Sequence, residues 1–446
     1  SNDFVSKTNI GMKEHNLNNF KFWKLQPLLY VTKRKEVDIL SKPCICIDVS
    51  KNTSHVQGFI NSIKTPVSKP FKIDHTLTEF NKIKDLYNKL VDLTNLKPLV
   101  IFEYTGVYHK CLIQFLELEK YDYHAVSPLK SAKHRNSEIR NAKTDKRDCK
   151  NLADMFYSDK LGTFYKHNSL YTNLKELNRA YHTNKIHLQK LEVTLNELID
   201  TIFPCFDNLF SDLLSQSALD FLEIFYHPDL INNSSLEDIT KFFMNSSIKH
   251  TESYSKSKAT KLKAYASNII SGCSINSYTT LFLLNTIKQL KQLLDIQNNI
   301  LTELIKLAKQ TSNFDIIRSI PGIGDISCAR LIAEIGDISR FKKPEQINAF
   351  IGVDPIINQS GIKDGKHLCI SKKGNKIARS IIFLIVRSMV RKKVKDNPIK
   401  LYYYKKKAQP NIVPKVALFA CVNKLIRMIH SLCKSGLIYE YSITQK

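Results

Sequence analysis

Four acidic residues on three separate segments have the types and spacing that metal-dependent chemistry requires. Asp48 and Glu103 each close a short run of β-branched and apolar residues, where a buried strand would deliver a side chain to the edge of a sheet. Asp145 and Asp148 stand three residues apart, which puts both on one face of a helix. Carboxylate oxygens are ligands that Mg²⁺ prefers. The four together predict a divalent-metal site.

The chemistry expected of such a site is phosphoryl transfer. Two Mg²⁺ ions about 4 Å apart, or Mn²⁺ in their place, activate a nucleophile and stabilise a leaving oxygen. Clustered carboxylates without a cation repel one another, so their convergence requires a metal or positive partners. Taken alone, Asp145 and Asp148 are better explained as surface helix residues paired with neighbouring lysines and arginine. Asp48 and Glu103 are not, because a buried strand end rarely carries an acid without a reason.

The charge balance indicates a nucleic-acid partner. The 446 residues carry a formal net charge of +26 at pH 7, which raises affinity for phosphate backbones and makes binding sensitive to salt. A solubilising surface in a Lys- and Asn-rich protein explains part of this excess. It explains less well why basic residues cluster beside the acidic motif and again near the C-terminus. An enzyme of small anionic metabolites is disfavoured.

Cysteine usage and hydropathy exclude other classes. The ten cysteines include no C-x-x-C pair, so we expect neither zinc nor a disulfide framework. No N-terminal apolar segment suits a signal peptide, and the longest apolar runs are too short to span a bilayer. We therefore expect an intracellular protein that makes no membrane contact.

The hydrophobic pattern divides the chain into four regions. Strands alternating with helices predict an α/β domain whose sites lie at strand ends, with helices expected at 76–93, 107–118 and 131–157. The four regions are a basic extension at 1–42, this α/β domain at 43–160, a coiled-coil stalk at 161–312 with a helical insert at about 204–277, and a mostly α-helical domain at 313–446.

Two heptad seams define the stalk. One runs from Leu174 to Ile202 and the other from Leu283 to Ala308, both with three-four spacing. They predict a helical hairpin or an oligomerisation stalk. Asn184 and Gln297 occupy core positions that would lie near the same level in an antiparallel pair, which hints at control of register.

The C-terminal region carries two turn motifs. Pro321-Gly322-Ile323-Gly324 has the form of a helix-hairpin-helix turn, in which Gly322 and Gly324 would let backbone N–H groups approach a phosphate; a short turn between helices is nearly as good an explanation. Ser360 lies in a polar turn, and a serine among cations can attack a phosphodiester. Alone, a Ser-Gly turn is far more often only a turn. The candidate nucleic-acid contacts around it are Lys363, Lys366, Lys372, Lys373, Lys376 and Arg379.

Two further helices are expected here, at 375–393 and 412–434, joined by a loop that contains residues 402–407. This Tyr-Tyr-Tyr-Lys-Lys-Lys run combines aromatic faces with cations. It would stack bases and neutralise phosphates, or it is a helix end with a solvated basic face. The tyrosines also keep a tyrosine-recombinase function formally open.

The order of these motifs resembles that of the transposases of the IS110 insertion-sequence family. The combination of motifs is specific for this family, although no single motif is. The 1–42 extension and the stalk insert look longer than a minimal member needs, and Asp354 stands where the family often has a less charged residue. The matching residues run from about Pro43 to the C-terminus: Asp48, Glu103, Lys143-Thr144-Asp145-x-x-Asp148, Pro321 to Gly324, Asp354-Pro355 to Ser360-Gly361, and Ile370-Ser371-Lys372-Lys373-Gly374-Asn375.

The resemblance implies a fold, a mechanism and partners. It implies a RuvC-like (RNase H fold) domain in which Asp48, Glu103, Asp145 and Asp148 bind Mg²⁺, a coiled coil, and a C-terminal domain in which Ser360 forms a phosphoserine link to DNA. It further implies a prokaryotic cytoplasmic enzyme, associated with the nucleoid when bound. A noncoding bridge RNA would pair with donor and target double-stranded DNA, and dimers to tetramers would build a composite site from different protomers.

Two other functions remain open from the residues. A RuvC-like Holliday-junction resolvase or nuclease would cut with metal-activated water and leave free ends, with Ser360 only structural. A non-catalytic nucleic-acid-binding protein would bind tightly with a steep salt dependence, and its acids would be dispensable. No ATP-binding G-x-x-x-x-G-K-[ST] run is present in the sequence, which suits a mechanism that keeps the phosphodiester energy in a covalent link.

Overall fold

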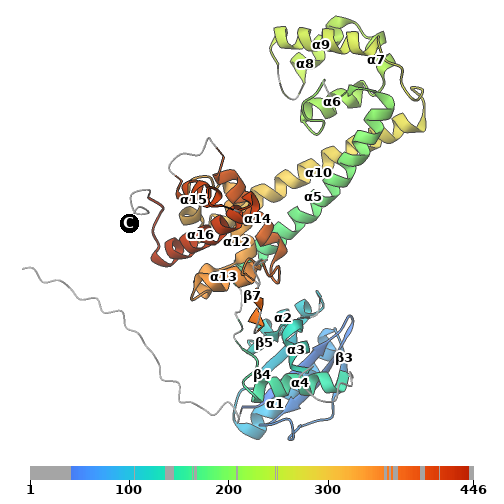
Figure 1. Ribbon diagram of the computed structural model, residues 1–446. Coiled ribbons are helices and arrows are strands. Elements are labelled where there is room, and N and C mark those ends of the chain that lie inside the picture. Colours follow the sequence, from blue (N-terminus) through green and yellow to red (C-terminus); the bar gives the residue numbers. More distant parts are fainter. Residues whose placement is uncertain are drawn as a thin grey trace, which may run out of the picture. The chain divides into compact units, whose positions relative to one another are not determined.

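The computed structural model describes most of residues 42–440, and the chain falls into two compact units, Ser1–Phe164 and Tyr165–Lys446. The first unit holds the mixed sheet and the second is mostly helical (Figure 1). The described ranges are 42–104, 106–135, 145–162, 164, 168–206, 209–246, 248, 250–355, 359–360, 363–364, 370–391, 397–410 and 412–440, with side chains undescribed at 129, 145–147, 359–360 and 363–364. The predicted extension therefore lies almost wholly outside these ranges.

Five strands form the mixed sheet of the first unit. Their order is β3-β2-β1-β4-β5; β1, β2 and β3 are antiparallel, whereas β1, β4 and β5 run parallel. The predicted alternation of strands with helices is confirmed from β3 onward. The strands are β1 (Cys44–Val49), β2 (Thr53–Phe59), β3 (Phe71–Asp74), β4 (Leu99–Glu103) and β5 (Tyr123–Val126).

Helices cover both faces of this sheet because its side chains alternate between two apolar cores. Ile45, Ile47 and Phe102 pack with α1 (Leu77–Thr94) and α2 (His109–Leu118). Cys44, Cys46 and Ile101 pack instead with Leu152 of α4 (Asp145–Tyr157). Helix α1 begins where predicted, since the Thr76 hydroxyl accepts from the Glu79 N–H.

The long basic helix expected at 131–157 is described only at its two ends, so its continuity stays a prediction. The structure has two helices there, α3 (Pro128–Arg135) and α4, and residues 136–144 lie outside the described part.

The stalk is an antiparallel pair of long helices, α5 (Ser169–Ile202) and α10 (Tyr278–Ala308), which lie side by side in Figure 1. Leu174 shares one core with Ala308, and Ile202 shares another with Leu283, as the heptads predict. The Asn184 Nδ2 donates to the Leu293 carbonyl at 2.9 Å, one helical turn before Gln297. Gln297 Oε1 is buried and accepts no hydrogen bond from the described residues.

The insert is a small helical domain with an aromatic core. The Phe221 ring packs against the rings of Phe225 and Phe243, and these side chains join the second stalk core. Its helices are α6 (Gln216–Ile224), α7 (Pro228–Asn233), α8 (Leu236–Asn245) and α9 (Glu252–Ala266).

The C-terminal domain packs around the other end of the stalk. The run at 402–407 lies in helix α15, not in the predicted loop, because Asn397 caps the helix and Pro398 opens it. Helix α16 is apolar and long enough to cross a membrane by composition, but its buried side chains belong to this core. The elements are α11 (Phe314–Arg318), α12 (Asp325–Ile335), η3 (Ile338–Arg340), α13 (Pro344–Ile351), β6 (Gln359–Ser360), β7 (Lys363–Asp364), α14 (Lys376–Met389), α15 (Pro398–Lys407) and α16 (Pro414–Ser435).

We expect Phe221→Ala to unfold the insert selectively. Removing this fully buried ring costs about 3–5 kcal/mol of folding free energy, which exceeds what a small helical domain can lose. Hydrogen exchange should rise throughout α6 to α9 and stay unchanged in the β-sheet. Ile224→Ala, at a position 55% exposed on the same helix, is the matched control; equal effects of the two substitutions would contradict this account.

Candidate active site

The parallel pairing of β1 with β4 brings Asp48 and Glu103 to the same edge of the sheet. Ile47 lies opposite Phe102, so the next residues, Asp48 and Glu103, occupy neighbouring positions at the ends of adjacent strands. Alternation along each strand places both on the face that also carries Cys46. That face is the one covered by α4.

Helix α4 brings Asp148 to this edge. The adjacent residue, Cys149, donates its thiol to the His55 carbonyl at 3.2 Å, and His55 is the β2 partner of Asp48. Asp145 is the first residue of α4, one helical turn before Asp148. Its side chain lies outside the described part of the chain, so the fourth member of the predicted quartet remains a prediction.

The Arg135 guanidinium stands between two of the acids. Its Nη1 lies 3.3 Å from Asp148 Oδ1 and its Nη2 lies 3.9 Å from Glu103 Oε2. The geometry of the closer contact is that of an ion pair only, because the buried Asp148 Oδ1 accepts no hydrogen bond from the described residues. Arg135, at the end of α3, therefore supplies positive charge where carboxylates from β4 and α4 approach one another.

The donor set fits a hard divalent cation. Asp48, Glu103 and Asp148 offer carboxylate oxygens, and Asp148 Oδ1 is a buried acceptor that lacks a hydrogen bond within the described part of the chain. Among the residues with described side chains, no three His, Cys, Asp or Glu groups converge closely enough to hold a metal. Arg135 fills that electrostatic role in this arrangement, which sequence reasoning missed; its position just before the acidic motif was the available signal.

A buried polar cluster fixes α3 against α4. The His134 Nδ1 lies 2.8 Å from Asn151 Oδ1, and Asn151 donates through Nδ2 to the Ser131 hydroxyl at 3.1 Å. The other His134 nitrogen lies 3.2 Å from Asp154 Oδ2. All three residues in the core of this cluster are buried, so the cluster holds the helix carrying Arg135 close to the helix carrying Asp148.

Ser360 is the last residue of the short strand β6, which pairs antiparallel with β7. In the backbone pairing of β6 with β7, Ser360 is opposite Lys363; the side chains of both lie outside the described part of the chain. We call residues 352–375 the serine arm. Near its base Pro355 bridges to Ile370, and the Ser371 hydroxyl donates to Asp354 Oδ1 at 2.6 Å. Asp354, the unusual acid of the motif, thus ties the two sides of the arm together.

The predicted nucleic-acid contacts divide into two groups. Lys372, Lys373 and Lys376 are exposed and available to phosphates. Arg379 is committed internally, since its Nη1 donates to the Ile351 carbonyl at 2.7 Å. Lys366 lies outside the described residues, as does the side chain of Lys363.

The two glycines of the Pro321–Gly324 turn differ in their surroundings. Gly322 has φ of +94°, and a Cβ there would lie 2.8 Å from Met389 Cγ, so its glycine is explained by packing. A Cβ on Gly324 would have nothing within 4 Å among the described residues. The open side of the turn is therefore at Gly324, at the N-terminus of α12, where a phosphate contact remains sterically possible.

Comparison with known proteins matches both halves of the chain. A family model for the DEDD transposase of IS110 elements matches residues 45–204, and one described as "Transposase IS116/IS110/IS902 family" matches residues 314–404. The chain is 36% identical over 89 residues to the transposase for insertion sequence element IS1111A of Coxiella burnetii, covering 20% of this chain and 24% of that protein. It is 26% identical over 130 residues to the pilin gene-inverting protein of Moraxella bovis, covering 29% and 39%. The chain thus spans less than half the length of either relative.

We expect Arg135→Gln to weaken the first unit when divalent metal is absent. Losing this partly buried cation leaves Glu103 and Asp148 to repel each other. The unfolding free energy should fall by about 1 kcal/mol, a value between those typical of exposed and of buried ion pairs. Because Mg²⁺ would replace the lost charge, its stabilising effect should be larger in the variant than in the original protein. Urea unfolding in EDTA and in Mg²⁺ measures both quantities.

The matched control is Lys133→Gln, an exposed cation on the same helix. An equal response of the two variants to Mg²⁺ would show that Arg135 has no particular relation to the acidic edge.

Proposed function

This chain belongs to the IS110/IS116/IS902 family of transposases, and we propose that it transfers DNA strands through a phosphoserine intermediate formed at Ser360. The observation that carries the proposal is the combination of two features in one chain. Carboxylates lie near the ends of β1 and β4 and in the first turn of α4, and a serine lies in strand β6, which pairs with β7. The match of separate family models to these two regions supports it.

The RuvC-like acidic site is proposed to prepare the phosphate. The DEDD type of domain implies use of a divalent metal, and Asp48, Glu103, Asp145 and Asp148 are the residues that would hold Mg²⁺. When bound, the metal supplies positive charge that positions and polarises a phosphate. Arg135, which pairs with Glu103 and Asp148, would offset the charge of these carboxylates when no metal is bound.

The serine carries the covalent step. The Ser360 hydroxyl oxygen attacks phosphorus and loses its proton, a phosphorus–oxygen bond to the sugar breaks, and the departing sugar oxygen takes up a proton. A sugar hydroxyl of another strand then attacks the phosphoserine and restores the serine. One phosphodiester is exchanged for another, so no nucleotide hydrolysis is required. The exposed Lys372, Lys373 and Lys376 would bind the flanking phosphates.

The partners proposed are donor and target double-stranded DNA, a structured noncoding guide RNA, and further copies of this chain. The net charge of +26 suits nucleic acid of either kind. A dimer to tetramer would allow the acids of one protomer to meet the serine of another. Copies of the insertion sequence should therefore carry a structured noncoding segment beside the gene.

Replacing Ser360 tests the covalent step. The original protein, mixed with labelled DNA, guide RNA and Mg²⁺, should give a protein–DNA adduct that survives denaturing electrophoresis, and Ser360→Ala should give none. Ser380→Ala, an exposed serine on α14, should retain the adduct. Adduct from Ser360→Ala would exclude this nucleophile, and cut strands with free ends in both proteins would favour the nuclease alternative.

Replacing Asp148 tests the acidic site. Asp148→Asn keeps the shape but removes a charge, so single-turnover strand cleavage should fall about a hundredfold, as for loss of one electrostatic contact to a transition state. DNA affinity should change little, and removing Mg²⁺ with EDTA should abolish cleavage. Asp159→Asn, an exposed acid beyond the end of α4, serves as control. Unchanged behaviour of Asp148→Asn would support a non-catalytic binding protein.

A further inference from the structure

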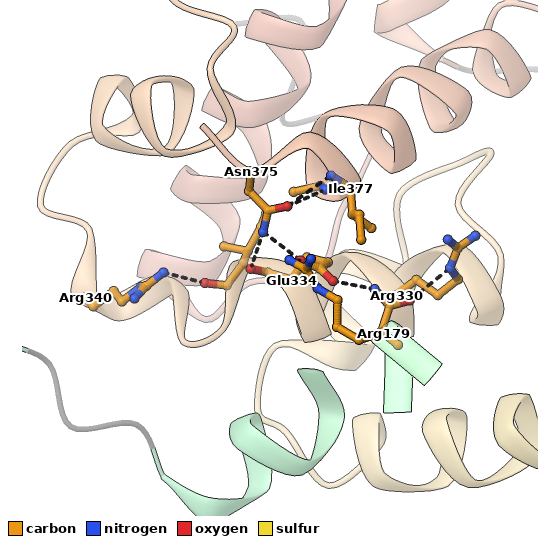
Figure 2. A network of polar contacts seen from close by, with 9 residues as sticks. Arg179, Arg330, Glu334, Arg340, Asn375 and Ile377 are labelled. Atoms are coloured by element: carbon orange, nitrogen blue, oxygen red, sulfur yellow. Dashed lines mark hydrogen bonds and ion pairs between the residues drawn. The ribbon is translucent and has the colours of Figure 1, made fainter. Parts of the chain in front are cut away.

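A single buried carboxylate, Glu334 near the end of α12, lies where the stalk meets the serine arm. Its side chain has no solvent exposure. The residue is surrounded by cations and amides from three elements (Figure 2). Because burial of an uncompensated carboxylate is costly, this position needs a structural or functional reason.

Two of the Glu334 partners come from the stalk helix α5. Asn178 donates through Nδ2 to Glu334 Oε1 at 2.7 Å, and Arg179 donates through Nη2 to Oε2 at 2.8 Å. Asn178 is itself held, because its Oδ1 accepts from Arg330 Nε at 3.1 Å. The Arg330 guanidinium also lies over the ring of Tyr181, another stalk residue. The stalk and α12 are thus joined by charge-assisted hydrogen bonds.

The third partner, Asn375, is the last residue of the serine arm. Its Nδ2 donates to Glu334 Oε2 at 2.6 Å. Its Oδ1 accepts from the Ile377 and Ala378 N–H groups at 3.1 Å each, which caps α14. Both ends of one side-chain amide are therefore used, and the Asn375 orientation is fixed by the two contacts together.

The base of the serine arm leaves little freedom for this end to move. The Asn375 N–H donates at 2.8 Å to the carbonyl of Phe350, two residues before the arm begins. A Cβ on Gly374 would lie 2.5 Å from that same carbonyl oxygen and 2.7 Å from Gly352 N. The entry and exit of the arm are in backbone contact, so a shift of Asn375 must shift both.

We propose that Glu334 is a positioning residue that holds the base of the serine arm, residues 352–355 and 370–375, in a set orientation on the stalk, so that displacement of α5 is passed to this base through Asn178, Glu334 and Asn375. A buried ion network of this kind is weak support for stability; its geometry specifies one arrangement of three elements. The proposed transmission of movement from α5 to the base of the arm rests on the contacts of Glu334. Its consequence for the rate of strand attachment rests on the function proposed above for Ser360.

The test is a complementary pair of substitutions. Asn375→Asp keeps the oxygen that caps α14 but turns the donor toward Glu334 into a second acid, so the contact becomes repulsive. Glu334→Gln added to it restores a donor facing an acceptor. We expect exchange of the Ser371, Lys372 and Asn375 amides, whose carbonyl partners lie across the arm base, to quicken about tenfold in Asn375→Asp and to return toward the original rate in the double variant.

Adduct formation should follow the same pattern, slowing about tenfold and recovering, while DNA affinity and helix content stay unchanged. Asn178→Ala, on the stalk side, should also quicken exchange at the arm base. Glu303→Gln, which removes an exposed pair with Lys306 on α10, is the matched control and should change nothing.

Unchanged exchange at the arm base in Asn375→Asp, or no recovery in the double variant, would overturn the positioning role. A loss of adduct that tracks a loss of folded protein would do the same. If the original protein forms no adduct at all, the function proposed for Ser360 fails, and the exchange pattern alone then decides the role of Glu334.

Discussion

Taking a carboxylate out of water costs several kcal/mol unless donors or cations surround it, and both units of this chain are organised by that constraint. In the first unit, Arg135 stands between Glu103 and Asp148. In the second, Glu334 is enclosed by Arg179 and two asparagines. In each case the acid and its partners come from different elements, so satisfying the charge also fixes how those elements pack.

The two sites differ in how completely the oxygens of their acids are hydrogen-bonded. Both oxygens of Glu334 accept short hydrogen bonds, whereas Asp148 Oδ1 is buried and accepts none from the described residues. The Glu334 carboxylate accepts hydrogen bonds from three side chains and has no solvent exposure. Asp148 Oδ1 lies beside Arg135 without a hydrogen bond from the described residues, which suits the metal use implied by the DEDD domain.

Much of the architecture could be predicted because it depends on local periodicity. The strand runs ending at Asp48 and Glu103 indicated the α/β order, and the heptads from Leu174 and Leu283 indicated the paired stalk helices. A prediction that depended on where a helix begins failed: residues 402–407, expected in a loop, are helical. Apolar spacing does not report such boundaries, since capping and tertiary contacts decide them.

The sequence alone indicated the acids as candidates for chemistry, because acids that end apolar strands are readable from residue type and spacing, whereas Ser360 was singled out only by the family resemblance. Only the tertiary structure decided their surroundings. It paired β1 with β4 in the register that makes Asp48 and Glu103 neighbours, and it placed Arg135 against Asp148. It also engaged Arg379 in a hydrogen bond to a backbone carbonyl and packed Gly322 against Met389. It joined Asn178, Glu334 and Asn375, which are far apart in the chain. Such contacts depend on long-range pairing and burial, for which no local pattern in the sequence provides a signal.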